Sequence, residues 1–282
     1  MAGVRRATRR VLPPRGHASY GGGVHPPLDV DRLRADLGAR WPRIEVVAET
    51  ASTNADLLAD TDAPDRSVLA AEHQLAGRGR FDRAWTSPPR AGLTFSARLR
   101  PAVPLPLWGW LPLLAGVALH EGIADVAGSG FGLKWPNDLL AGDGRKLAGI
   151  LVQTSGEAVV VGIGLNVHAE AGELPVDTAT SLALAGATGL DRTALLTAIL
   201  ARLDARVAQW ADHGGDAEAC GLGAAYREAC TTIGRPVRVV LADGDVLEGD
   251  AVGVDGLGRL VVRSAVGESA VGAGDVEHVR TA

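Results

Sequence analysis

The chain has 282 residues, of which 46% are hydrophobic and 22% are charged, a composition typical of a globular protein with one main core. Its net charge of −5 gives no general attraction for nucleic acid, which disfavours a DNA- or RNA-binding protein. The two cysteines, Cys220 and Cys230, have the spacing of neither a disulfide framework nor a metal site. We therefore expect a cytoplasmic protein with free thiols and no structural metal.

Residues 1–27 differ in composition from the rest of the chain. They are rich in Arg, Gly and Pro, and no acidic residue precedes Asp29, so they cannot bury a core. An Arg-rich, acid-poor start resembles a transit peptide, but the Pro and Gly content argues against an amphipathic helix. The segment is predicted to be a disordered tail.

Between residues 28 and 99 the pattern alternates helices and strands. Leu33 and Leu37 share one face of a helix that Gly38 ends. A cluster of possible N-caps precedes a second helix and places hydroxyl groups where a polar ligand could meet them. The predicted elements are helices at 28–38 and after Ser52, Thr53 and Asn54, and strands at 44–48, 68–72 and 93–99.

Two segments, one within this region and one directly after it, need separate interpretation. A Gly- and Arg-rich loop at residues 76–89 joins two strands, and a loop that long is usually functional or mobile. Residues 101–119 carry no charge and are long enough to raise the question of a membrane span. Prolines at 101, 104, 106 and 112 interrupt this stretch, so it is interpreted as a loop that enters a buried helix.

The second half of the chain is predicted to hold strands at 132–135, 146–153 and 158–165, with a turn at Gly142, Asp143 and Gly144 joining the first two into a hairpin. Asp191 caps a long amphipathic helix, and a second helix spans 217–229. Short strands at 237–241, 246–254, 260–263 and 276–279 then suit a small β-barrel or sandwich. The predicted domains are 28–232 and 233–282, after the tail at 1–27.

The loop at 76–89 carries the first candidate chemistry. Gly77, Arg78, Gly79 and Arg80 alternate flexible backbone with guanidinium groups, so amides and charged side chains can converge on one anion. Arg83 and Trp85 extend the same loop. A solvated basic loop would explain these four residues equally well if they stood alone.

Lys134 and Lys146 lie on predicted strands with apolar neighbours, where an unpaired ammonium group is costly. Asp138 is a candidate partner, or a ligand for a Mg²⁺ ion that bridges phosphates, and Asn137 shapes the turn that presents it. The alternative for Lys146 is an exposed lysine on an edge strand. We favour an anion site because the two lysines occur together with the basic loop.

Gly162 and Gly164 interrupt a strand that is otherwise apolar, where glycine weakens a strand unless another group must approach the backbone. A β-bulge is the alternative. Asn166 follows with a free donor and acceptor. No arrangement of His, Cys or Ser announces a metal site or a nucleophile, so the chemistry depends on positive charge. Activation of a carboxylate by ATP fits that requirement.

Five motifs in this order resemble those of the biotin protein ligases, from residue 46 to the end of the chain. The motifs are STN at 52–54, QLAGRGR at 74–80, KWPNDL at 134–139, RKLAGIL at 145–151 and GIGLN at 162–166. The resemblance implies an α+β fold: a mixed sheet packed with helices, followed by an SH3-like barrel. It also implies that biotin and MgATP form biotinyl-5'-AMP, which then biotinylates a lysine of a biotin carboxyl carrier domain of a carboxylase.

The resemblance further assigns roles to residues. Lys146, Arg78 and Arg80 match catalytic positions. The biotin- or adenylate-binding positions match Ser52, Thr53, Asn54, Gln74, Gly77, Arg78, Arg80, Lys146, Gly149 and Gly162. The ATP-binding positions match Arg83, Trp85, Lys134, Asn137, Asp138 and Asn166, and Mg²⁺ would be held through Asp138. No nucleic acid or membrane partner is expected, and the protein would be a monomer or a weak homodimer.

Two departures from the family pattern bear on function. Asp82 stands where the family's loop usually has glycine, which could alter loop closure. Residues 1–27 are too short for a winged-helix domain, so we expect a ligase without repressor activity. The alternatives are a lipoate- or octanoate-transferring enzyme of the same superfamily, a regulator that binds biotinyl-adenylate, and a non-catalytic biotin-binding protein.

Overall fold

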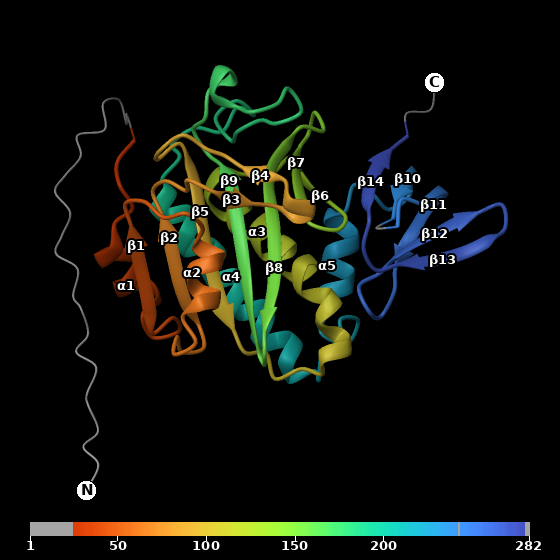
Figure 1. Ribbon diagram of the computed structural model, residues 1–282, viewed down its shortest axis with the longest axis horizontal. Helices are drawn as coiled ribbons and strands as arrows, with labels where there is room; N and C mark the ends of the chain where they lie inside the picture. Colours follow the sequence, from red (N-terminus) through yellow and green to blue (C-terminus); the bar gives the residue numbers. More distant parts are fainter. Residues whose placement is uncertain (1–24, 242, 280–282) are drawn as a thin grey trace, which may run out of the picture.

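Strands that are mostly apolar, and almost continuously buried in the centre, build a seven-stranded mixed sheet in the order β1-β2-β5-β9-β8-β7-β6 (Figure 1). The structure is a computed structural model that describes residues 25–241 and 243–279. β1 and β2 pair in parallel, and the remaining neighbours pair antiparallel. The strands are β1 (Arg43–Val47), β2 (Ser67–Ala71), β5 (Gly92–Leu99), β6 (Phe131–Lys134), β7 (Asp138–Ala141), β8 (Lys146–Ser155) and β9 (Ala158–Asn166).

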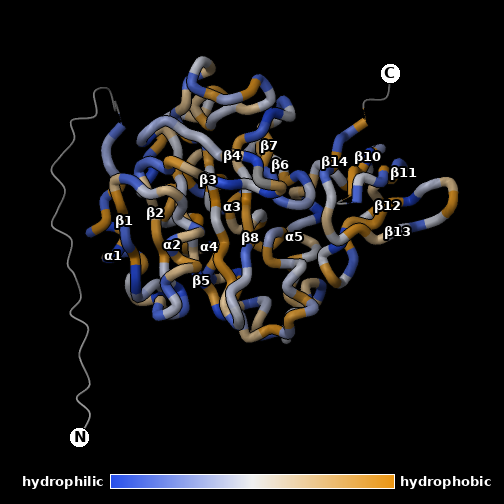
Figure 2. The backbone as a smooth tube through the Cα atoms, viewed as in Figure 1, coloured by the Kyte–Doolittle hydropathy of each residue, from blue (hydrophilic) through white to orange (hydrophobic). Residues whose placement is uncertain are grey.

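Helices cover the two faces of this sheet unequally. One face carries the main core against four helices, as the orange inner segments in Figure 2 indicate. They are α1 (Val30–Leu37), α3 (Leu111–Ala127), α4 (Arg192–Asp212) and α5 (Leu222–Ala229). The opposite face carries the short helix α2 (Thr53–Ala59), which packs on β2, β5 and β9. That second face is left partly open, and the candidate site occupies it.

The apolar stretch after residue 101 enters the core through a 3₁₀ helix at Leu105–Trp110 and continues as α3. By length and composition, Leu105–Ala127 could cross a membrane. Ten residues of α3 are buried among the other elements, which is the position of a core helix. The prediction of a loop that enters a buried helix is confirmed.

A second, antiparallel sheet of five strands follows, in the order β13-β12-β11-β10-β14. The strands are β10 (Pro236–Val240), β11 (Val246–Val254), β12 (Leu260–Ser264), β13 (Gly267–Val271) and β14 (Asp275–His278). This C-terminal module shares its core with the main body. The indoles of Trp110 and Trp135 also donate hydrogen bonds to the carbonyls of Gly256 (3.0 Å) and Gly258 (3.2 Å). The predicted α+β fold with a small C-terminal β module is confirmed.

Several predicted elements need correction. The turn at 142–144 was predicted to join the strand at 132–135 to the strand at 146–153. It joins β7 to β8 instead, because a four-residue strand, β7, follows Pro136 and Asn137 and was not predicted. The helix predicted at 217–229 begins only at Leu222, since Gly221 has a left-handed backbone (φ 73°). The loop at 76–89 contains the short strands β3 (Gly77–Arg78) and β4 (Ala84–Trp85). β13 was also missed.

Part of the predicted tail, residues 1–24, lies outside the described residues, as does the side chain of Asp82.

A buried ion pair fixes the end of β2 beside the site. Arg192, at the start of α4, contacts Glu72 at 2.8 Å, and their side chains are 3% and 8% exposed. Arg192 also donates to the carbonyls of Gly92 (3.1 Å) and Pro26 (2.7 Å). Removing one partner of such a buried ion pair strongly lowers the free energy of unfolding, because the other charge is left buried without a partner. The pair therefore holds the strand end that leads into Gln74.

Candidate active site

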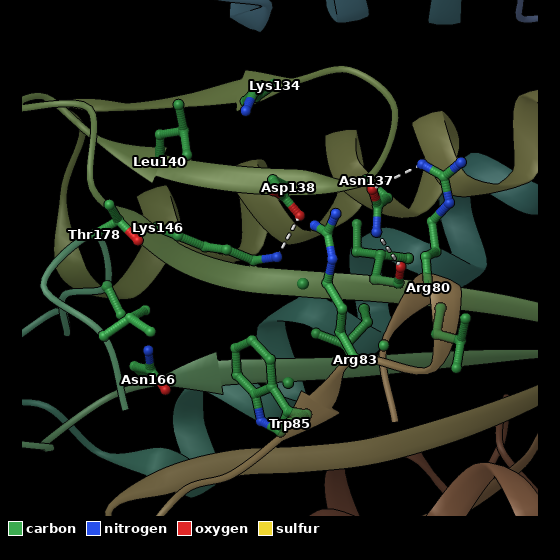
Figure 3. Close-up of a pocket in the computed structure, with 18 of the residues that line it drawn as sticks. Arg80, Arg83, Trp85, Lys134, Asn137, Asp138, Leu140, Lys146, Asn166 and Thr178 are labelled. Carbon is green, nitrogen blue, oxygen red and sulfur yellow. Dashed lines mark hydrogen bonds and ion pairs between the residues drawn. The ribbon is translucent and has the colours of Figure 1, made fainter. Parts of the chain in front are cut away.

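A cavity of about 1400 Å³ lies on the α2 face of the sheet, between the loop at 76–89, the β6–β7 hairpin and the C-terminal module (Figure 3). Single-ligand pockets usually measure about 300–1,000 Å³, so this one has room for two substrates. All predicted site residues except Gly77 line it. They are Ser52, Thr53, Asn54, Gln74, Arg78, Arg80, Arg83, Trp85, Lys134, Asn137, Asp138, Lys146, Gly149, Gly162 and Asn166.

The floor of the cavity is made flat by glycines. Gly149 and Gly164 are directly paired across β8 and β9, and the indole of Trp85 lies over them. A Cβ atom added at Gly164 would overlap the Trp85 ring, and one added at Gly149 would lie 3.4 Å from it. Glycine is therefore required at 164 for the close approach of an aromatic side chain.

A network of short hydrogen bonds at the start of α2 orders one end of the cavity. The side-chain oxygen of Gln74 accepts from the amide (2.8 Å) and hydroxyl (2.9 Å) of Thr53. The Ser96 hydroxyl lies 2.7 Å from the Thr53 hydroxyl and 2.5 Å from Asn54 Oδ1, so its single proton serves these two acceptors. Gly162 leaves the space that the Asn54 amide occupies. These polar groups are fixed before any ligand arrives, which favours specific binding.

Lys146 and Asp138 form an ion pair at the centre of the cavity, with Nζ 2.6 Å from Oδ1 (Figure 3). Their side chains are 36% and 21% exposed, and Oδ1 has no hydrogen bond of good geometry. The ammonium also lies 5.9 Å from the Trp85 ring centroid, within the range of a cation–π contact. The carboxylate thus balances the lysine while leaving it accessible from the cavity.

The basic loop contacts both the hairpin and the C-terminal module. Arg80 donates to Asn137 Oδ1 and to the carbonyl of Gly274, both at 3.3 Å, and burial lowers the pKa of its guanidinium. Arg83 pairs with Asp275. Phe81, between them, has a left-handed backbone (φ 55°), which is uncommon for a residue with a Cβ. The loop is therefore held closed over the cavity from two sides.

The segment after β9 anchors the backbone on which Lys146 stands. The Lys146 amide donates to the Thr178 carbonyl (2.7 Å), and its carbonyl accepts from Thr180 (2.8 Å). Asn166 donates to the Thr180 carbonyl (2.9 Å), which ties the end of β9 to the same segment. This segment carried no motif in the sequence, and its role depends on chain folding alone.

Other cavity residues were missed because they belong to the C-terminal module. Arg235, Asp275 and His278 line the cavity, although they lie far along the chain from the basic loop and have no motif spacing. His278 Nε2 is 3.1 Å from Thr232 Oγ1. Burial, followed by the charges of Lys134 and Arg235, lowers the pKa of His278 to about 4. The imidazole is therefore neutral at neutral pH.

This depressed pKa predicts a stability that depends on pH. An unfolded histidine binds a proton near pH 6.5, whereas native His278 does so only near pH 4. The free energy of unfolding should therefore fall as the pH is lowered from about 6.5 to about 4. Denaturant melts of His278→Gln should show a shallower fall across this window. His168, whose pKa is also lowered to about 4, and carboxylates with a lowered pKa such as Asp60 and Asp191 contribute to the fall that remains. Parallel curves for the variant and the parent would contradict the assignment.

The fold and the cation-lined cavity define a class of protein: a nucleotide-dependent ligase with an attached β module. The chain belongs to the biotin protein ligase family. Residues 44–169 match the biotin/lipoate A/B protein ligase family, and residues 232–279 match the biotin protein ligase C-terminal domain. The family and fold inferred from the five motifs are confirmed.

Several relatives are similar along most of the chain. The chain is 43% identical to the biotin–[acetyl-CoA-carboxylase] ligase of Mycobacterium tuberculosis, covering 91% of this chain and 98% of that protein. It is 33% identical to the bifunctional ligase/repressor BirA of Bacillus subtilis, over 83% of this chain and 72% of that protein. The structure superposes on the Aquifex aeolicus biotin protein ligase in complex with biotin and ATP with a TM-score of 0.72, at 25% identity, covering 85% and 99% of the two chains.

Proposed function

We propose that this chain activates biotin with ATP and transfers it to a lysine of a biotin carboxyl carrier domain. The observation that carries the proposal is the meeting of Lys146, Arg78 and Arg80 over one cavity large enough for both substrates. In the proposed division of the chain, residues 28–232 form the catalytic domain and residues 233–282 the C-terminal domain.

In the first step, a carboxylate oxygen of biotin attacks the α-phosphorus of ATP. The bond from that phosphorus to the bridging oxygen breaks, and pyrophosphate leaves with the electron pair. Carboxylate and phosphate repel each other, so fixed cations lower the barrier by stabilising the charge of the transition state. Lys146 lies at the centre of the cavity and contacts both anions in this proposal, while Arg78 and Arg80 bind the phosphate.

In the second step, the amine of the acceptor lysine attacks the acyl carbon of biotinyl-5'-AMP. An amide forms as the bond between the acyl carbon and the phosphate oxygen breaks, AMP leaves with the electron pair, and the amine loses a proton to solvent. The mixed anhydride also reacts with water, so a closed loop that excludes water protects it. The contacts from Arg80 to Gly274 and from Arg83 to Asp275 hold the loop over the cavity in this role.

The residues present fit a Mg²⁺ ion that arrives with ATP. Mg²⁺ in nucleotide sites is bound through one or two carboxylates together with the substrate phosphates, and the Asp138 carboxylate lines the cavity, where the ion would share it with Lys146. Bound there, the ion would offset phosphate charge. Asp138 would hold it, and Asn137 would fix the turn beside it.

The same proposal places the protein in the cytoplasm, where its substrates and acceptor carboxylases occur, as a monomer or a weak homodimer. Acyl-CoA carboxylase and pyruvate carboxylase are the proposed types of acceptor.

ATP–pyrophosphate exchange in the presence of Mg²⁺ tests the adenylation step. Exchange should depend on biotin and be absent with lipoate or octanoate, because the polar network at α2 is built for a specific acid. Exchange with lipoate or octanoate alone would assign the chain to the lipoate-handling branch of the family. Exchange with none of the three acids would refute the adenylation proposal.

A further inference from the structure

A buried hydroxyl beneath the first turn of α2 contacts the polar network without reaching the cavity. Ser96 lies on β5, in register with Leu69 on β2 and Gly162 on β9, and it is 0% exposed. Its hydroxyl contacts Thr53 and Asn54. These two residues line the cavity, whereas Ser96 does not. Any effect of Ser96 on a ligand must therefore pass through these two side chains.

The Asn54 amide has one orientation that satisfies its contacts. Its Nδ2 lies 3.2 Å from the Leu151 carbonyl and 2.9 Å from Gln153 Oε1. A backbone carbonyl can only accept a hydrogen bond, so the nitrogen faces Leu151 and Oδ1 faces Ser96. Both amide protons are then used, and the Ser96 hydroxyl is the donor that lies 2.5 Å from Oδ1. Asn54 is 5% exposed, so loss of this donor would leave a buried acceptor unpaired.

The Gln74 amide is oriented in the same way through Thr53. The Thr53 amide can only donate, and it lies 2.8 Å from Gln74 Oε1, so the oxygen of Gln74 faces α2. A Cβ atom added at Gly77 would lie 2.6 Å from Gln74 Nε2, which places that nitrogen beside the start of the basic loop. The Thr53 hydroxyl lies between Gln74 (2.9 Å) and Ser96 (2.7 Å). Ser96 is thus connected to a side chain next to the loop.

The same strand also holds the far end of α2. Arg98, two residues after Ser96 on β5, is 4% exposed and donates to the carbonyls of Leu57 (3.1 Å) and Asp60 (3.2 Å). A cation at the C-terminal end of a helix stabilises it. Because Arg98 holds this end independently, loss of the Ser96 hydroxyl should loosen the first turn of α2 without detaching the helix.

We propose that Ser96 is a positioning residue for biotin, which it orients through Asn54 and Thr53 without touching it. The inference rests on the proposed function and deepens it. The ring of biotin carries N–H donors and a carbonyl acceptor, so it needs protein groups of fixed donor and acceptor direction. Amides that are already oriented bind such a ring without being ordered first, and this ordering would otherwise reduce affinity. The biotin carboxylate reacts at Lys146 in the proposed function, so Ser96 should govern biotin affinity and not the chemical step.

Ser96→Ala in the full chain tests this role, with Ser67→Ala as the matched control. Ser67 lies on the neighbouring strand β2, is also 0% exposed and donates to the Pro64 carbonyl (2.8 Å). Each variant therefore loses a buried hydroxyl, and both should melt below the parent. In calorimetric titrations, Ser96→Ala should raise the Kd for biotin roughly tenfold, which corresponds to one hydrogen bond of about 1.4 kcal/mol. Ser67→Ala should keep the parental Kd.

Exchange kinetics and a conservative variant separate positioning from folding. Ser96→Ala should raise the KM for biotin, while kcat and the KM for ATP stay at their parental values. Ser96→Cys has a weaker donor in the same place and should bind biotin with intermediate affinity. An equal rise in Kd for Ser67→Ala would show that lower stability alone weakens binding, and it would overturn the inference.

A double-mutant cycle shows whether Ser96 acts through Asn54. Ser96→Ala should weaken biotin binding no further when Asn54→Ala is already present, because residues of one hydrogen-bond network are not additive. Additive losses, or a parental Kd for Ser96→Ala, would overturn the inference and leave the proposed function intact. A parent that binds biotin without biotin-dependent exchange would instead refute the proposed function, while a parent that binds no biotin would refute both.

Discussion

Lys146→Met should lower the rate of biotin-dependent ATP–pyrophosphate exchange by roughly 10²–10³-fold, the usual effect of removing one fixed group that stabilises transition-state charge. Lys146 lies at the centre of the cavity, 2.6 Å from Asp138. Methionine is close in length to the aliphatic part of lysine and carries no charge, so the two reacting anions would face each other and Asp138 without a central cation. The measurement is the exchange rate at saturating biotin and ATP.

The neighbouring Arg145→Met provides the matched control. Arg145 pairs with Asp143 on the exposed turn before β8 and does not line the cavity, so its replacement should change exchange by less than about twofold, as surface pairs contribute little. Thermal melts of both variants should stay close to that of the parent. An exchange rate for Lys146→Met within tenfold of the parent would show that the reaction does not depend on this ammonium group.

Gly164→Val should lower kcat/KM for biotin by about 100-fold, because misplacing a positioning group by about 1 Å has an effect of that order. A Cβ atom at 164 would overlap the indole of Trp85, and the side chain that covers the floor of the cavity must then move. The measurement is biotin-dependent exchange as a function of biotin concentration.

Two further variants test whether overlap between a Cβ atom at 164 and the Trp85 indole causes the loss of kcat/KM. Gly253→Val, on β11, places the same side chain where no atom lies within 4 Å of the new Cβ, so it should leave kcat/KM unchanged. Trp85→Ala combined with Gly164→Val should lose no more activity than Trp85→Ala alone. If the two losses multiply instead, Gly164 serves the cavity by some means other than room for the indole.

Local pattern was sufficient for the parts of the site that lie in continuous motifs. Gly77 to Arg80 and the segment from Lys134 to Lys146 were predicted to handle anions because glycines and cations alternate there among apolar residues. The structure brings Arg78, Arg80, Lys134 and Lys146 to one cavity. The basic loop and both lysines therefore converge as the prediction required, while their individual roles stay proposals.

Other parts of the site depend on which strands become neighbours. The need for glycine at 164 comes from Trp85, which lies far away in sequence and reaches the floor only when the loop folds over β9. The sequence pattern did not predict β7, because only four residues separate the turn at Pro136 and Asn137 from the next turn, too few to show a strand periodicity. Arg235 and His278 reach the cavity through the packing of the C-terminal module, which no spacing in the sequence encodes.

Both side-chain amines of the molecule lie in the cavity. The sequence contains two lysines, Lys134 and Lys146, and both line the cavity. An amine-selective acylating reagent would therefore modify lysine only inside the site, and bound nucleotide or adenylate would shield those two positions. Intact-mass spectrometry of the acylated protein would thus report occupancy as the number of acyl groups beyond the one on the N-terminal amine, without an engineered label or an activity assay.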